Sequence, residues 1–549
     1  MILQLPPELM AHIFRYCMAS RGSTHKSKDS KAHWLSFTHV CRFWRSVALD
    51  DASLWTSFQF GHRHLSQIIL ERSKALPLDL WYFHHTGRKS YFDDEDELLE
   101  TLRRHLHRTE SLHLTICIAQ NEDVRFLHRL VQPAPILRAL EINSNDGFTL
   151  SADFLAGEAP SLTNLRIRSA YLSWESPLLA NLTHLELRGN SRSNIPTTSQ
   201  LVKALRAMPL LENLVLRGIL PNIIDAAMEC VALPRLHELD ISGNIYQCTG
   251  LLRLVSFPVT TVLSISEDID SDFNDVGDFD VFVFQLPLLF CPVVSSVDSE
   301  EQRDHARVTK TLFIILGGTS GPVVDVTLHA WNHGDVPINV FDSGSDSEQL
   351  DDPTPVTSPF LSLWLEWCPV PPRSWVEEDL EVLFSSLPVA SVETLRIKGY
   401  PEPRFGARES NEDEDEDEDP VARNLGDLPF RATNTKSLVV SDDFMKSRIP
   451  EICAVLRSRN DSVTPPVLAF PALTTLTLLP TDGCLSFLSN RVPPSFMELL
   501  LDTLRYRSDH GRRVEVLLLA AEWFCYLSPE TVARLKDVVG ELREFTKCI

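Results

Sequence analysis

Few residues in this sequence have the types and spacing that covalent chemistry needs. The run Leu316–Gly321 reads LGGTSG and follows an apolar segment, as a phosphate-binding loop would. It lacks the Lys and the following helix of such a loop, and Pro322 with the apolar residues after it predicts a strand–turn–strand connection instead. His84 and His85 are adjacent, and neighbours on a strand point to opposite faces, so they are poor joint metal ligands.

The sequence contains no His-Glu-x-x-His, Gly-x-Ser-x-Gly or Walker motif. Its 11 cysteines are odd in number and form no Cys-x-x-Cys pair, which indicates free thiols in a reducing compartment. Cys17 and Cys41 are expected to pack in a helical core. We therefore expect a cytoplasmic or nuclear protein that is not an enzyme and uses no cofactor and no metal. An enzyme with its site among the loops after residue 265 stays open as an alternative.

Charge and hydropathy exclude two further classes of function. The formal net charge is −24, and no cluster of Lys and Arg exists that could displace phosphate counterions, so nucleic acid is not an expected partner. No stretch of about 18 uncharged apolar residues is present, so no membrane span is expected. Hydrophobic content of 44% is ordinary for a folded chain.

The first 55 residues carry the most informative pattern. Leu5, Leu9 and Ile13 recur at helical spacing in an amphipathic segment that Pro6 and Pro7 can open, and Phe14 and Cys17 widen its apolar stripe. A polar loop over 20–33 follows, and a second helix is expected over about 35–49. The apolar residues of that second helix fall on one side: Phe37, Val40, Cys41, Trp44, Val47 and Ala48. Leu54 and Trp55 are expected to fold back onto it.

This ordered set resembles an F-box over about residues 3 to 57: a Leu-Pro-x-Glu-Leu start, an Ile-Phe pair, a Val-Cys-x-x-Trp helix and a closing Leu-Trp. The resemblance implies binding to the small adaptor of an SCF (cullin-RING) ubiquitin ligase and, through it, to a cullin. It also implies which residues hold the box together or contact the adaptor: Leu5, Pro6, Pro7, Leu9, Ile13, Phe14, Val40, Cys41, Trp44, Leu54 and Trp55. Trp44 and Trp55 are expected in the core, and Pro6 with the exposed side of the first helix at the contact. An ordinary helical cap on a repeat array is the competing interpretation.

Internal repetition is the second strong pattern. The motif Pro-x-Leu-x-x-Leu-x-Leu/Ile recurs with intervals of 20 to 29 residues, the period of leucine-rich repeats. Its marker leucines are Leu140, Leu165, Leu185, Leu214, Leu239 and Leu263, and an earlier copy contains Leu112. Helical stretches over 97–107 and 199–208 precede two of the strands. We therefore predict an α/β fold in which an all-α box precedes an irregular leucine-rich-repeat solenoid, with parallel strands concave and helices convex. A conventional α/β sheet stays the alternative.

After residue 265 the pattern loosens. Further units are expected at 327–328, 392–397, 436–440, 471–478 and 514–518. Inserts at about 268–280, 342–359 and 401–427 are expected to be disordered, and the last contains nine acidic residues within 409–419. Ser528-Pro529-Glu530 predicts a closing helix with an apolar stripe at Val532, Leu535, Val538, Val539 and Leu542.

The expected domains are a box over 1–57 and a solenoid over 58–549. The function that follows from the resemblance is that of a non-catalytic substrate-recognition subunit of an SCF ubiquitin ligase, with the repeats binding an unknown protein target. A scaffold that binds partners without directing ubiquitination is the alternative.

Overall fold

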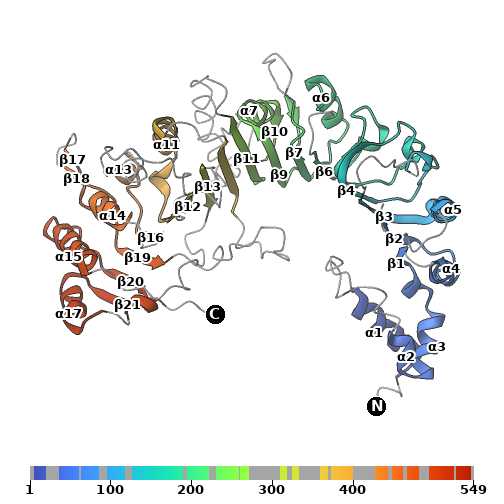
Figure 1. Cartoon of the computed structure of the whole chain (residues 1–549), viewed down its shortest axis with the longest axis horizontal. Helices are drawn as coiled ribbons and strands as arrows, with labels where there is room; N and C mark the ends of the chain where they lie inside the picture. The colour runs from blue at the N-terminus through green and yellow to red at the C-terminus, as the bar shows by residue number, and fades with distance from the viewer. Residues whose placement is uncertain are drawn as a thin grey trace, which may run out of the picture. The chain divides into compact units, whose positions relative to one another are not determined.

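The computed structural model (Figure 1) divides into two compact units, Met1–Leu236 with Leu254–Phe257, and His237–Arg253 with Pro258–Ile549. It describes residues 5–19, 36–60, 63–85, 95–117, 127–189, 195–221, 230–258, 260–270, 309–317, 324–332, 359–368, 373–399, 427–442, 448–461, 466–480, 494–524 and 527–545. Nearly all of the three predicted inserts lies outside these residues. The predicted boundary between a box and a solenoid at residue 57 stays a prediction.

The first unit begins with short helices. They are α1 (Pro7–Ala19), α2 (Phe37–Val40) and α3 (Arg42–Asp50), followed by the 3-10 turn η3 (Ala52–Trp55). The single helix expected over about 35–49 is therefore wrong. Cys41 is extended, with φ −160° and ψ 171°, and separates α2 from α3. Its Sγ accepts a hydrogen bond from the backbone N–H of Trp44 at 3.4 Å, so Cys41 caps α3 in the way that Ser or Asp usually does.

A parallel sheet follows in the same unit, with its strands paired in chain order. The strands are β1 (Ser57–Phe60), β2 (Leu78–His85), β3 (Thr109–Cys117), β4 (Ala139–Thr149), β5 (Asn164–Tyr171), β6 (His184–Arg188) and β7 (Asn213–Arg217). Leu112, Leu140, Leu165, Leu185 and Leu214 lie opposite one another across the sheet and are fully buried. The leucine-rich-repeat register is thus confirmed.

Helices and 3-10 turns connect these strands. They are α4 (Arg63–Arg72), α5 (Glu95–His105), η4 (Leu106–Arg108), η5 (Leu127–Arg129), η6 (Phe154–Gly157), η7 (Pro177–Leu179) and α6 (Thr198–Arg206). Thr197 and Gln200 form a capping box that starts α6, and Leu201 and Leu205 bury its apolar side. A small parallel pair, β8 (Val231–Ala232) with β10 (Val255–Ser256), completes the unit. The α4, α5 and α6 helices lie on one side of the sheet (Figure 1), as expected for a repeat fold.

The second unit is likewise built on paired strands. Its strands are β9 (Glu238–Asn244), β11 (Val262–Asp270), β12 (Thr311–Gly317), β13 (Val324–Trp331), β14 (Leu361–Cys368), β15 (Thr394–Gly399), β16 (Ser437–Asp442), β19 (Thr475–Pro480), β20 (Val516–Ala520) and β21 (Glu541–Phe545). Its helices are α7 (Ile245–Leu254), α11 (Arg373–Ser386), η10 (Val389–Ser391), α13 (Leu428–Arg431), α14 (Arg448–Arg457), α15 (Pro494–Asp509), α16 (Ala521–Phe524) and α17 (Pro529–Val538). The strands β17 (Arg459–Asn460) and β18 (Val467–Leu468) form a separate antiparallel pair. Leu395, Leu438, Leu476 and Leu517 align across β15, β16, β19 and β20.

The repeat pattern is interrupted at β12–β14. The sheet runs β11–β14–β13–β12–β15, and β13 is antiparallel to both of its neighbours. The expectation that residues 327–328 start a further parallel unit is therefore wrong. Residues 318–323 are too few for the crossover that two parallel strands require, so the chain reverses directly. The β12–β13 pairing confirms the strands expected on both sides of Leu316–Gly321, whereas residues 318–321 of that run lie outside the described residues.

The closing helix α17 starts at Pro529, with the Ser528 side chain as its cap, as predicted. The predicted stripe runs too far, because Val539 is extended and Leu542 lies on β21. This strand adds a last parallel partner to β20.

Buried arginines close several turns between repeats. Arg507, fully buried on α15, donates to the carbonyl oxygens of Leu456, Ala469 and Phe470 at 2.8–2.9 Å. Arg108 does the same in the first unit, toward the carbonyls of Leu70, Lys74 and Leu76. Each guanidinium donates to several carbonyl groups at a turn, and of the three that Arg507 binds only the Phe470 carbonyl also accepts a backbone hydrogen bond in the described part of the chain, from Leu473 at 3.1 Å.

In the parts of the chain that the structure describes, no helix is both long and apolar enough to cross a bilayer.

Candidate functional site: a helical docking face and a polar sheet face

The helical box has an aromatic core. The Phe14 ring on α1 is fully buried, stacks on Phe37 with centroids 4.5 Å apart, and lies 5.2 Å from the Trp44 ring. Met10, one turn earlier, is also fully buried. Packing of this kind holds α1 against α2 and α3 through one side of α1 only, because the buried residues recur at a spacing of four.

A neighbouring side of α1 is apolar and open to solvent. Leu9, Ile13 and Tyr16, which we call the α1 stripe, are exposed by 51%, 43% and 75%. They recur at i, i+4 and i+7 and therefore line one side of the helix. Val40 on α2 is exposed by 59%. Large apolar side chains grouped on a small element are typical of a partner-binding surface.

The other predicted box residues take different places. Leu54 and Trp55 are fully buried, Pro6 and Pro7 are exposed, and Leu5, Cys41 and Trp44 are half-buried. The expectation that Cys17 packs in the helical core is wrong, because its thiol is exposed at the end of α1. Which of the predicted residues contact an adaptor stays a prediction.

Trp55 joins the box to the repeat sheet. Its indole N–H donates to the carbonyl of Ala48 on α3 at 2.8 Å, which confirms the expected fold-back. The Arg72 guanidinium of α4 lies 4.4 Å from the Trp55 ring centroid on the other side of the connection. Two residues later, β1 starts and pairs with β2. Trp55 therefore contacts both α3 of the box and α4 of the first repeat.

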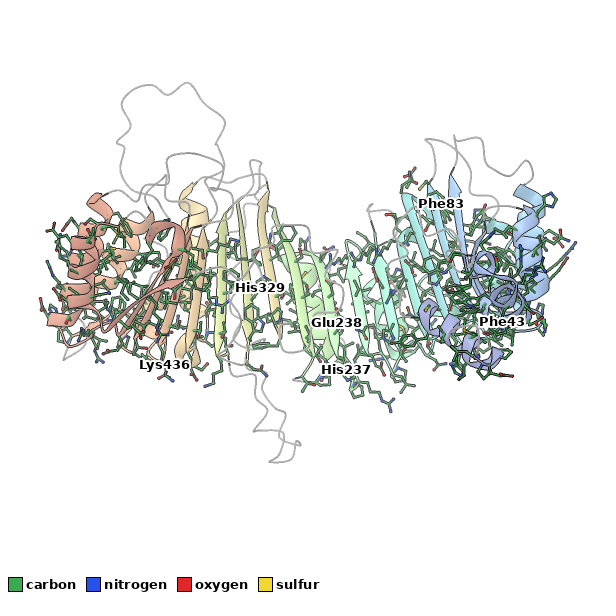
Figure 2. The ribbon with its side chains drawn as sticks, turned by 90° about the horizontal axis from the view of Figure 1, so that it is seen from below. Phe43, Phe83, His237, Glu238, His329 and Lys436 are labelled. Atoms are coloured by element: carbon green, nitrogen blue, oxygen red, sulfur yellow. The ribbon has the colours of Figure 1, made fainter. Side chains whose placement is uncertain are left out.

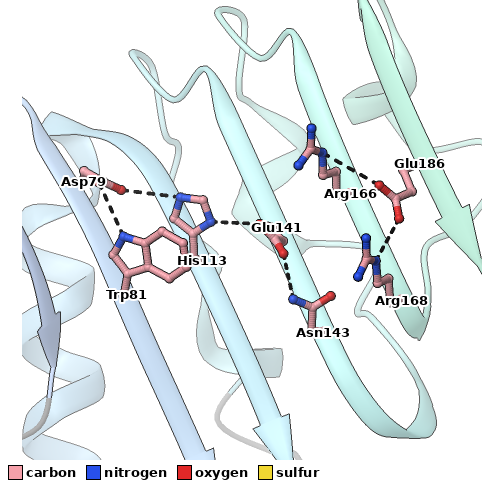
Figure 3. Close-up of polar contacts among 8 residues, drawn as sticks. All are labelled: Asp79, Trp81, His113, Glu141, Asn143, Arg166, Arg168 and Glu186. Carbon is pink, nitrogen blue, oxygen red and sulfur yellow. Dashed lines mark hydrogen bonds and ion pairs between the residues drawn. The ribbon is translucent and has the colours of Figure 1, made fainter. Parts of the chain in front are cut away.

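The sheet of the first unit carries a continuous row of polar side chains on the face opposite its buried leucines. In register across β2 to β6 this row contains Trp81, His113, Glu141, Arg166 and Glu186. A second row, two residues further along each strand, contains Phe83, Thr115, Asn143, Arg168 and Arg188. Figure 3 shows most of these side chains linked by hydrogen bonds and ion pairs. We call the two rows together the polar face.

His113 lies between two carboxylates at one end of the polar face. Its Nδ1 is 3.0 Å from Glu141 and its Nε2 is 3.4 Å from Asp79 (Figure 3). Its ring stacks on Trp81 with centroids 3.7 Å apart. Burial lowers the pKa of His113, but the hydrogen bonds and charges of Asp79 and Glu141 outweigh burial and raise the pKa to about 9. The ring is therefore an imidazolium at neutral pH.

The two carboxylates respond in the opposite sense. The hydrogen bond from His113 outweighs burial and lowers the pKa of Glu141 to about 2, with help from Asn143 and Arg166. Burial raises the pKa of Asp79, but hydrogen bonds from His113, Ser57 and Trp81 leave it below its ordinary value. Both groups are ionised at neutral pH, so this end of the face carries a net charge of about −1.

Arginines dominate the other end. Arg168 and Arg188 each bring Nε to 2.7 Å from the same oxygen of Glu186, and Arg166 lies 3.8 Å from its other oxygen. We call Arg166, Arg168 and Arg188 the arginine cluster. Glu186 neutralises one of these three positive charges, and Glu141 on β4 lies opposite Arg166 in the register and interacts with it as well.

No local sequence pattern predicts the polar face. Its signal lies at the variable positions of each repeat: the residue directly after the marker leucine falls in the first row, as Glu141 and Arg166 do after Leu140 and Leu165. Aligning the repeats on their leucines would have placed these residues side by side, because parallel strands in register bring equivalent positions together.

Within the described residues no group of three or more His, Cys, Asp or Glu side chains could hold a metal ion. Six of the described cysteines, Cys41 and Cys453 among them, form no disulfide. The chemistry that the two surfaces support is recognition: an apolar contact at α1 and a charged contact on the polar face.

Comparison with known protein families agrees with this architecture in the helical box at the N-terminal end of the chain. Residues 2–60 match the F-box-like family model, which confirms the resemblance over the helical box. No curated protein matches the chain significantly. Among solved structures, nine chains match, including the leucine-rich repeat-containing protein LegL7 from Legionella pneumophila, with 14% identity and a TM-score of 0.26 over 79% of this chain and 90% of that one. The chain thus combines an F-box-like domain with repeat units that its own strand register defines as leucine-rich-repeat-type.

Proposed function

We propose that this protein is the substrate-recognition subunit of an SCF ubiquitin ligase. In this proposal α1 binds the ligase adaptor and, through it, a cullin, while the repeats bind a protein target. The observation that carries the proposal is the exposed α1 stripe on a folded F-box-like domain. The protein would act without catalysing a reaction, by holding its target near the enzyme that transfers ubiquitin. We place this activity in the cytoplasm or the nucleus.

The connection through Trp55 supports the proposal on physical grounds. A receptor that positions a target needs its two binding surfaces held at a fixed separation. A mobile linker between them would lower the effective concentration of the target near the enzyme that transfers ubiquitin. Here Trp55 bonds to Ala48 on one side and packs beneath Arg72 on the other, so no free linker separates the box from the first repeats.

The α1 stripe gives a direct test of adaptor docking. Leu9 and Ile13 are half or nearly half exposed, so Leu9→Ala with Ile13→Ala should leave folding intact and weaken adaptor binding by about tenfold or more. Ile68→Ala on α4 is a matched control, because Ile68 is exposed by 41% and lies outside the stripe. Equal adaptor affinity of the double variant and the control would refute docking through the α1 stripe.

A scaffold that binds the adaptor and other proteins without directing ubiquitination is the second candidate. The two functions differ in the fate of the bound protein. If the protein is a substrate receptor, proteins that bind its repeats should accumulate when the proteasome is inhibited. They should also accumulate when the double variant Leu9→Ala, Ile13→Ala replaces the wild type. Unchanged abundance of those proteins in both conditions would favour the scaffold.

A further inference from the structure

The second unit is buried on both faces of its strands at β12, β13, β15 and β16. The aligned leucines of these strands face the helices α11, α14 and α15, which lie on one side of the strands (Figure 1). On the other face Phe313, Trp331 and Val439, which we call the covered cluster, are exposed by only 7%, 1% and 4%. Val439 directly follows Leu438 of the leucine row, and successive residues of a strand point to opposite faces. The covered cluster therefore lies on the face away from these helices.

The covered cluster is a small apolar core of its own. Phe313 and Trp331 pack together, and the half-buried Ile315 packs against them. Satellite clusters of this kind usually lie beneath long connecting segments of a chain. The arrangement therefore indicates that a connection, rather than a helix of the repeats, shields this face from water.

The corresponding face of the first unit is open by comparison. Phe83 on β2 is exposed by 46%, and the Arg166 side chain by 47%. His329 lies among the strands of the second unit (Figure 2), with its Nδ1 2.9 Å from the Ser362 hydroxyl oxygen. Burial lowers the pKa of His329 to about 4, so its ring is neutral at neutral pH. Because these residues of the second unit are buried within a single chain, the cover belongs to the same chain.

Two cations are buried on the covered face. Arg396 and Lys398 on β15 are exposed by 6% and 5%. Arg396 lies opposite Phe313 and Val439 in the register. Lysine and arginine are almost never fully buried unless they are paired. The cover should therefore combine apolar residues with acidic ones.

The connection between β11 and β12 has to cross a face of the sheet. The β14 strand is parallel to β11, and β13 is antiparallel to both β14 and β12, so β11 and β12 point the same way. The chain must therefore return along the length of the strands before β12 can start. About ten extended residues suffice for that return, at about 3.3 Å per residue. Residues 271–308 are available for it, which leaves a long stretch to lie on the sheet.

The composition of this connection matches the cover. Eleven of the fourteen residues of Val281–Val294 are apolar, and Asp278 and Asp280 come just before them. The connections after β13 and β15 match less well, because 342–359 is rich in Ser, Asp and Pro and 409–419 is almost entirely acidic. The connection from β11 to β12 itself lies outside the described residues, so the argument rests on the burial of the strands beside it.

We propose that residues 271–308 pack on this face of their own unit, with Val281–Val294 on the covered cluster and with Asp278 and Asp280 beside the buried cations. The inference goes beyond the proposed function, because it involves neither an adaptor nor a target. It has one consequence for that function. If the repeats bind a target, the strands β12, β13, β15 and β16 offer it no open face, whereas the polar face of the first unit is open.

Photo-crosslinking of the full chain identifies the cover directly. The photoreactive residue p-benzoyl-phenylalanine replaces Phe313 in one sample and Phe83, on the open face, in the matched control. After irradiation and digestion, we expect the probe at position 313 to be joined to peptides that contain residues 281–294, and the probe at position 83 not to be. Crosslinks from position 313 to residues 333–358 or 400–426, to a second copy of the chain, or to no peptide at all would overturn the inference.

Thiol labelling tests whether the apolar run is what buries the face. Val439→Cys and Leu438→Cys are compared in the natural chain and in a chain whose residues 281–294 are replaced by a Gly-Ser segment of equal length. An uncharged thiol reagent should label position 439 about tenfold or more faster once the run is replaced, because its cover is gone. Position 438 faces the helices and should stay slow in both chains. An equal labelling rate at position 439 with and without the natural run would contradict the proposal.

Discussion

His113 and its two carboxylate partners, Asp79 and Glu141, form an ion triad. Because of this triad we expect the first unit to lose stability in alkaline solution. Folding raises the pKa of His113 from 6.5 to about 9, so the imidazolium stabilises the folded sheet fully below about pH 6.5. That contribution is lost as the pH rises through about 9. This rise in the pKa of His113 corresponds to about 3 kcal/mol of folding free energy. Screening by solvent at the partly exposed Asp79 and Glu141 side chains reduces it to about 1–2 kcal/mol.

The lowered pKa of Glu141 describes the same interaction from the partner's side, so the two effects are not added. Because folding lowers that pKa from 4.5 to about 2, the stabilisation is present above about pH 4.5 and lost as the pH falls through about 2. The triad is thus fully formed between about pH 4.5 and 6.5 and persists at neutral pH.

The assay is pulse proteolysis in urea at pH 6.5 and pH 9.5, with fragments of the first unit identified by mass. His113→Gln is the matched variant, since it keeps hydrogen bonds and removes the charge. We compare the free energy of unfolding of the wild type with that of His113→Gln at each pH. We expect the advantage of the wild type to be about 1–2 kcal/mol larger at pH 6.5 than at pH 9.5. A pH-independent difference between the two proteins, or a midpoint for His113 near 6.5 by NMR, would refute the reasoning.

Three further substitutions, the last with a matched control, test the packing. Trp55→Ala should destabilise the box by about 3–5 kcal/mol in urea unfolding, because a fully buried ring and its bond to Ala48 are lost; a cost similar to that of an exposed site would contradict this. Arg507→Met should lower the free energy of unfolding of the second unit by about 3 kcal/mol or more, since the buried Leu456 and Ala469 carbonyls lose the Arg507 donor and the Phe470 carbonyl keeps only Leu473. An unchanged calorimetric Tm would argue against that role. Gly218→Ala should cost about 1 kcal/mol or more, as its φ is +67° and a Cβ would lie 2.9 Å from the Gly189 carbonyl. Gly511 has a φ of +70° and nothing within 4 Å of an added Cβ, so Gly511→Ala measures the backbone strain alone. Equal losses of stability in Gly218→Ala and Gly511→Ala would refute the steric clash at Gly218.

The repeat architecture could be predicted because one strong physical requirement produces it. Each short strand must bury one face, so a marker leucine recurs at nearly constant spacing, and Leu140, Leu165 and Leu185 align as expected. Similar reasoning identified the capped start of α17, where Ser528 and Pro529 act locally.

Features that depend on tertiary context were not predictable by the same means. The apolar spacing of residues 35–49 fits one helix, yet Cys41 adopts an extended conformation and starts a new one. The apolar strands β12 and β13 resemble repeat strands, but the short link between them forces an antiparallel pair.

The polar face illustrates a different limit. His113, Glu141 and Arg166 are widely separated in the sequence and occupy variable positions, so no local pattern groups them. Only the register of the parallel strands brings them together. The position of the candidate site follows from the repeat register. Its charge pattern becomes visible only when the strands are placed side by side in that register.

Hydrogen exchange of the full chain with and without the ligase adaptor tests the central claim most directly. If the box docks the adaptor while the repeats stay available for a target, protection should appear in α1 and α2 and be absent from β3 to β6. Protection on the polar face, or no protection of α1 at saturating adaptor, would contradict the account.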